Sequence, residues 1–227
     1  MLLRRTNISW CVVACFAAVA LLQADSVYGK PFKCHSKNVT VYASDNRDAV
    51  DSCRGAANAM KFLASQGLSM PAEITIRLVT EMPDTVMKSA LGAYVRETRE
   101  VHVLTYSALQ LRGRPLKAPL NRSLYRAVVS HEVAHAIAAV NFKKEPSYLG
   151  QEYIAYVTFF STMESTQRER ILRQFPPEEN WQVQAPVIYA FNSLEYGTHA
   201  YRHFLKAENG KGFLNKVLHG EVLSEFE

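Results

Sequence analysis

Apolar and polar residues alternate along this chain with two periods, that of a strand and that of a helix. The strand period occurs at residues 38–43 and 73–79 and on both sides of a polar turn within 90–106, which predicts a hairpin. The helical period occurs over 47–66, 121–142, a segment from Gly150 to about Gln174, 187–205 and 212–218. The sequence therefore predicts an α+β fold in which a small mixed sheet packs beside helices.

The segment 121–142 is the clearest predicted helix, because it contains no Gly or Pro and is rich in helix-forming residues. Asn121 or Ser123 can cap its N-terminus. One face carries an apolar stripe that can lie against the core, made of Val129, Val133, Ile137 and Val140. A cleft can then lie over a different face of the same helix.

The sequence His131-Glu132-Val133-Ala134-His135 lies inside this helix. Residues four apart share one helix face, so His131 and His135 direct their imidazoles at one point and form half of a tetrahedral zinc site. Glu132 can reach a water on the metal as a general base without being a ligand. The alternative, a helix with two core histidines, leaves Glu132 beside them unexplained.

A third ligand is expected downstream, on the next helix. Glu152 lies on an otherwise apolar and aromatic stripe with Tyr156, Phe159 and Met163, where a carboxylate is costly to bury unless a metal ion or another partner offsets its charge. A short loop between two antiparallel helices would bring Glu152 to the histidines. Glu145 is the competing candidate, although its neighbours Lys143 and Lys144 suggest a solvated loop.

The sequences His131–His135 and Gln151-Glu152-Tyr153-Ile154-Ala155 together resemble the gluzincin branch of the zincin metallopeptidases, over about residues 91–163. The resemblance, which suggests a family of small secreted bacterial zincins, implies a zincin-like fold. It makes His131, His135 and Glu152 the zinc ligands and Glu132 the catalytic base. It departs from better-known members at Tyr156, where some place an Asp that holds the first histidine, so the partners of the histidines stay open.

Two further expectations follow from this resemblance. One strand of the 90–106 hairpin would form the upper rim of the cleft and bind extended peptide by strand addition, although an ordinary hairpin satisfies the same residues. A Tyr or His beyond the Glu152 helix would stabilise the oxyanion. The segment 188–204 offers five candidates, of which Tyr201 and His203 are preferred: Tyr189, Tyr196, His199, Tyr201 and His203. Core packing is the alternative for each of them, and a second metal site at His199 and His203 lacks a nearby carboxylate.

The amino terminus predicts export. Arg4 and Arg5 precede a 15-residue apolar stretch, 8–22, which is short for a transmembrane helix, and Val27-Tyr28-Gly29 suits a signal-peptidase site. We therefore expect a signal peptide over 1–29, one catalytic domain over 30–227, and a secreted or periplasmic protein without stable membrane insertion. A retained membrane anchor and a lipid-modified Cys15 are the alternatives.

Only Cys34 and Cys53 would remain after cleavage, and in an exported chain they are expected to form a disulfide rather than two buried thiols. The formal net charge of the whole chain is +5, without a basic run, which does not favour nucleic-acid binding. We expect a monomer.

The sequence thus predicts a secreted zinc metallopeptidase that acts on peptide or protein substrates. Three alternatives stay open at this point. They are a zinc enzyme that hydrolyses a non-peptide amide such as a cell-wall bond, a catalytically silent binding protein that keeps the fold and metal, and a structural protein whose motif arose by chance.

Overall fold

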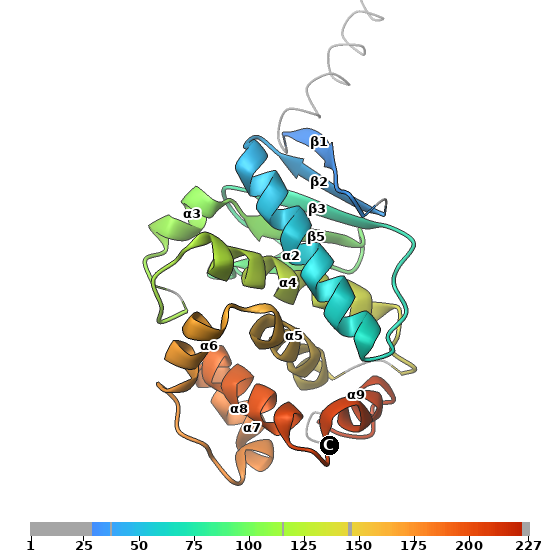
Figure 1. Cartoon of the computed structure of the whole chain (residues 1–227), viewed down its shortest axis with the longest axis vertical. Helices are drawn as coiled ribbons and strands as arrows, with labels where there is room; N and C mark the ends of the chain where they lie inside the picture. Colours follow the sequence, from blue (N-terminus) through green and yellow to red (C-terminus); the bar gives the residue numbers. More distant parts are fainter. Residues whose placement is uncertain (1–28, 37, 115, 145–146, 224–227) are drawn as a thin grey trace, which may run out of the picture.

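The computed structural model describes residues 29–36, 38–114, 116–144 and 147–223. Within these ranges the protein has a five-stranded sheet and eight helices, so the predicted α+β class is confirmed (Figure 1). The signal peptide predicted over 1–29 lies outside the described residues except for Gly29, and Glu145 also lies outside them.

The sheet has the order β1-β2-β3-β5-β4. Its strands are β1 (Lys30–Lys33), β2 (Val39–Ala43), β3 (Ile74–Val79), β4 (Gly92–Val95) and β5 (Glu100–Leu104). The three central strands run parallel, whereas β1 pairs antiparallel with β2 and β4 pairs antiparallel with β5. The β4–β5 pair is the predicted hairpin. The sequence did not predict β1, because this strand is short, largely exposed, contains Pro31 and shows no alternation.

Helices α2 (Asn46–Ser65) and α4 (Arg122–Ala139) pack on the sheet, and α3 (Tyr106–Leu111) follows β5. Figure 1 shows these elements in the upper half of the molecule and the remaining helices in the lower half. The lower helices are α5 (Tyr148–Thr162), α6 (Ser165–Leu172), α7 (Trp181–Phe191), α8 (Ser193–Leu205) and α9 (Gly210–Leu218). Helices α4 and α5 lie side by side, so their contact joins the two halves.

Helix α4 begins as predicted at the Asn121 cap, whose side chain accepts a hydrogen bond from the Leu124 amide at 2.9 Å. The predicted stripe is buried except at its end, where Val140 lies beyond the last turn and is exposed. Helix α2 packs closely on α4 at Gly55, where a Cβ would lie 2.7 Å from the Arg126 carbonyl oxygen. The Ser130 hydroxyl donates to the Gly55 carbonyl at 2.8 Å, which fixes α4 against α2.

Two predicted long helices are each divided into two. The segment expected to run from Gly150 to Gln174 breaks at Met163, whose backbone is extended, and continues as α6. The segment expected over 187–205 breaks at Asn192, whose side chain accepts from the Glu195 amide at 3.3 Å and caps α8. An Asn followed three residues later by Glu is a helix-start pattern, and the capping overrides the continuous apolar spacing.

The predicted disulfide between Cys34 and Cys53 is present, with the two Cα atoms 5.4 Å apart. It joins the segment after β1 to α2, so it holds the edge of the sheet against the helical layer. None of the helices in the described ranges combines the length and low polarity needed to cross a bilayer.

Candidate metal centre

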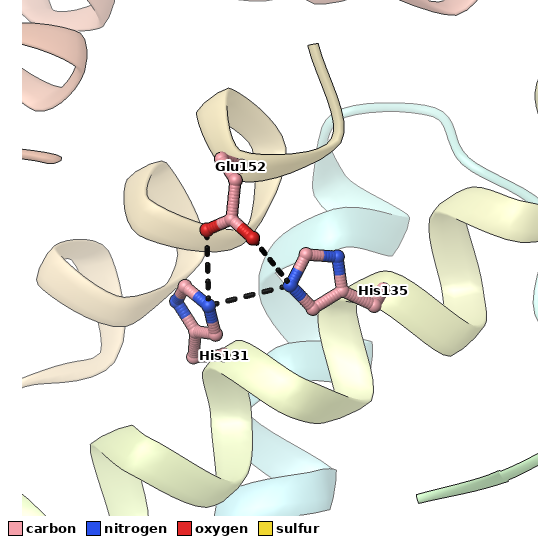
Figure 2. A group of neighbouring side chains, drawn as sticks. All are labelled: His131, His135 and Glu152. Atoms are coloured by element: carbon pink, nitrogen blue, oxygen red, sulfur yellow. Dashed lines mark hydrogen bonds and ion pairs between the residues drawn. The ribbon is translucent and has the colours of Figure 1, made fainter. Parts of the chain in front are cut away.

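Three side chains converge where α4 contacts α5. Helix α4 contributes His131 and His135, and α5 contributes Glu152, whose carboxylate points between the two imidazoles (Figure 2). The two histidine Nε2 atoms lie 3.3 Å apart. The Glu152 oxygens lie 3.5 Å from Nε2 of His131 and 3.6 Å from Nε2 of His135. The structure therefore brings together all three residues that the sequence proposed as ligands.

These separations suit a tetrahedral metal ion. Ligand atoms bound at about 2.0–2.1 Å around a tetrahedral ion lie about 3.3–3.4 Å from one another. The three observed separations of 3.3–3.6 Å are close to that value. Two imidazoles and one carboxylate leave one position of a tetrahedron open, which is the ligand count of a catalytic site and not of a closed structural site. The residues present therefore fit a divalent metal.

The pKa values of these three side chains are shifted because the groups are buried and lie close to one another. Burial lowers the pKa of His135 to about 4, although the Glu152 charge opposes this change. Burial also disfavours charge on His131, but its hydrogen bond with Glu152 and the nearby carboxylates raise its pKa overall. Burial acts to raise the pKa of Glu152, and the two histidines outweigh that effect and lower it. His135 is thus neutral, as a metal ligand must be.

Glu132 lies beside the three ligand residues and lines the same cleft. Its side chain is held against the backbone of β4, since a Cβ added at Gly92 would lie 2.5 Å from its Cγ and 2.9 Å from its Oε1. Burial raises the pKa of Glu132 to about 7, with His131 opposing the shift and Glu152 adding to it. A carboxyl with this pKa can both accept and donate a proton near neutral pH.

The cleft above these residues has a volume of about 490 Å³. It is bordered by β4, by the loop before it, by α4 and α5, and by the α7–α8 junction, with lining residues that include Leu91, Gly92, Ala93, Tyr94, Gln151, Tyr189 and Ser193. Strand β4 is an edge strand of the sheet. The expectation that one hairpin strand borders the cleft is therefore met by β4.

Tyr201 and His203, the preferred oxyanion donors, are not brought to the cleft. Tyr201 packs against the Phe160 ring and beneath the Arg168 guanidinium. His203 lies between the Trp181 and Phe213 rings, with its Nδ1 2.9 Å from the Tyr153 hydroxyl. The two residues are two positions apart and lie on different faces of α8, and each face packs against interior aromatic side chains away from the cleft.

Of the five candidates in the segment 188–204, Tyr189 lines the cleft. Its hydroxyl lies on the Glu152 side of the cleft, where it helps to lower the pKa of that carboxyl. Its ring also packs edge-on against Tyr148, with centroids 4.6 Å apart. Tyr148 was not among the predicted site residues, although it lies four residues before Glu152 on the same helix face and that spacing indicates it.

Tyr156 follows Glu152 by one turn of α5 and lies against the first histidine. Its ring meets the His131 ring edge-on, with centroids 4.6 Å apart. Gly197 of α8 makes room for it, since a Cβ there would lie 2.3 Å from Tyr156 Cδ1. The His131 ring therefore packs against an aromatic side chain at position 156 and not against a carboxylate there.

Comparison with known proteins places the chain in one family. It belongs to the family described as "Family of unknown function (DUF6639)", whose model matches residues 39–227. No curated protein and no solved structure matches the chain. The matched range contains every residue of the metal centre and of the cleft.

Proposed function

We propose that this protein is a zinc-dependent metallopeptidase of the gluzincin type with a zincin-like fold. The observation that carries the proposal is the convergence of His131, His135 and Glu152 at tetrahedral separations with Glu132 beside them. The resemblance of the motif to that group gives the reaction class. A zinc ion held by these three side chains would polarise a peptide carbonyl and lower the pKa of a bound water.

Glu132 acts as the proton carrier in this proposal. It takes the proton from the attacking water at its carboxylate and delivers it to the nitrogen of the leaving amine. The contact with Gly92 holds the carboxylate in place for both transfers. Because Glu132 lies on the same helix turn as His131 and His135, α4 itself sets where Glu132 starts relative to the two histidines.

In this proposal Tyr189 stabilises the oxyanion, the role for which the sequence favoured Tyr201 and His203. Its phenol lines the cleft beside Glu152, and rotation of its single O–H toward a bound substrate would let it donate a hydrogen bond to the negative charge that develops on the carbonyl oxygen. We expect Tyr189→Phe to lower kcat about 10- to 100-fold and to leave zinc content unchanged. Tyr201→Phe is the matched control, since Tyr201 does not line the cleft.

Strand β4 provides the means to align a substrate. As an edge strand beside Glu132 it offers backbone groups to an extended peptide, which would add to the sheet by hydrogen bonds independent of side chains. We therefore propose peptide or protein substrates. The disulfide suits an oxidising compartment, so we further propose that the protein acts outside the cytoplasm, in the periplasm or the medium.

Metal analysis and a hydrolysis assay test the proposal together. Purified protein should contain one zinc per chain, Glu152→Ala should lose most of it, and Glu132→Gln should keep it while losing hydrolysis of a denatured protein substrate. Glu195→Ala, a control carboxylate outside the cleft, should change neither property. Absence of zinc from wild-type protein prepared without chelator would refute the metal centre, and a fully active Glu132→Gln variant would refute the mechanism.

A further inference from the structure

A second hollow adjoins the metal cleft and has no role in the mechanism above. We call it the α7 pocket; its volume is about 580 Å³. It shares four residues with the metal cleft: Met87, Tyr148, Tyr189 and Ser193. The remaining lining residues are Leu149, Pro186, Ala190 and Phe191, so no charged side chain lines it. The pocket is therefore suited to an apolar group.

The helix beside this pocket exposes an unusual amount of apolar surface. Val183, Val187 and Phe191 are spaced four apart on α7, and all three are exposed, Phe191 to 88%. No charged residue occurs between Glu179 and Glu195. A helix on a protein surface normally turns charged or polar residues to water, and an apolar stripe of this kind marks a binding surface.

The position of the pocket indicates what binds there. Tyr189 lines both the α7 pocket and the metal cleft, and Glu152 lines the metal cleft, so the α7 pocket opens beside the metal centre. Met87 lies five residues before β4 and lines both hollows. A polypeptide aligned along β4 therefore passes the mouth of the α7 pocket close to the bond held at the metal centre.

We propose that the α7 pocket binds a large apolar side chain of the polypeptide substrate, so that the protein selects segments rich in residues such as Leu and Phe. This inference rests on the proposed function and adds the substrate class. Burial of one such side chain should strengthen peptide binding about tenfold or more over Ala. Unfolded or processed polypeptides expose such segments, whereas folded proteins bury them.

Binding to the zinc-loaded Glu132→Gln protein tests this without turnover. Fluorescence anisotropy would compare a labelled Ala-rich host peptide with versions that carry Phe, Leu or Asp at successive positions. Phe and Leu at one or two positions should bind at least about tenfold more tightly than Ala. Phe191→Asp and Ala190→Trp, which charge and fill the pocket, should remove that preference and leave the affinity for the Ala host unchanged.

Leu111→Asp is the matched control, because Leu111 on α3 is exposed to 89% and lines neither hollow. Persistence of the preference in both pocket variants, or its equal loss in Leu111→Asp, would overturn the inference. Loss of binding to phosphatidylglycerol vesicles in Phe191→Asp, with peptide binding unchanged, would also overturn it and assign the stripe to a membrane surface.

The inference can fail separately from the proposed function. If zinc-loaded wild-type protein cleaves denatured protein but peptides show no apolar preference, the substrate class is wrong and the metallopeptidase proposal stands. If no peptide binds and nothing is cleaved by the zinc-loaded protein, both fall together.

Discussion

Two groups of buried carboxylates lie beside α4, one at its N-terminus and one near its middle, and they meet different partners. Near its N-terminus, Asp48 and Asp51 of α2 are paired with Arg122 and Arg126, with nitrogen–oxygen distances of 2.5–3.3 Å. About two turns further along, Glu132 and Glu152 line the cleft with His131, His135, Tyr156 and Tyr189. Among the described residues that line the cleft there is no lysine or arginine.

This difference separates a cluster that is neutralised within the protein from one that, in our proposal, binds a metal. The chain supplies its own permanent cations to Asp48 and Asp51, so that cluster is neutral without any ligand. Glu132 and Glu152 are buried without a permanent cation, which is costly in a low-dielectric site. A metal ion bound by Glu152 and the histidines would supply the missing charge. Three substitutions test that division, and acid then tests a buried group outside both clusters, in order from the largest expected effect to the smallest.

Glu132→Gln should reduce hydrolysis about 10³-fold, because a general base of this kind contributes about 10²–10⁴-fold. Its free energy of unfolding without metal should stay the same or rise, because an uncompensated buried carboxylate has been removed. Steady-state kinetics and denaturant unfolding measure the two effects. A variant that loses stability rather than activity would place Glu132 in the structural class.

Asp51→Ala should show the reverse pattern. Asp51 is buried and bridges Arg122 and Arg126, so its loss leaves two guanidinium groups without that partner. We expect the free energy of unfolding to fall by about 2–4 kcal/mol, less than for a fully buried pair because both arginines are partly exposed. Zinc content per folded chain should not change. Loss of zinc at temperatures where the variant is folded would contradict the division between the clusters.

Gly92→Ala should reduce activity about 10²-fold and leave zinc content unchanged. The added Cβ would force the flexible Glu132 side chain away from its place, and a displacement of about 1 Å is enough for such a loss. The fold should tolerate the change because the atoms that yield belong to one side chain. Gly212→Ala is the control, since nothing lies within 4 Å of its added Cβ.

Acid should lower the free energy of unfolding through His203, which lies in the aromatic interior and outside the metal centre. Burial lowers the pKa of His203 to about 4, and Lys206 adds to the shift. The unfolded chain takes up a proton below about pH 6.5 while folded His203 stays neutral, so stability falls as the pH drops from about 6.5 to 4.

The loss from His203 should be at most about 1.4 kcal/mol per pH unit. Denaturant unfolding of wild type and His203→Asn, both with a chelator, measures it. The variant should show the shallower pH dependence across this window. Identical slopes in the two proteins would mean that His203 is protonated in the folded state.

The parts of the fold that depend on neighbours in sequence were predictable. Helix α4, its Asn121 cap and the β4–β5 hairpin follow from residues within one helix turn or one polar turn of each other. The division between α5 and α6 and between α7 and α8 was missed, because apolar spacing continues through both breaks. Strand β1 was missed because its few residues become a strand only by pairing with β2.

The sequence by itself determined the reactive group on α4. The i, i+4 spacing of His131 and His135 fixes their convergence wherever that helix lies, since helix geometry is local. Only the tertiary structure decided which distant residues complete the site. The placement of Glu152, the contact between Gly92 and Glu132, and the choice of Tyr189 over Tyr201 and His203 all depend on how α5, β4, α7 and α8 pack. Helical spacing fixes which residues share a face, but packing between distant elements fixes which face meets the cleft.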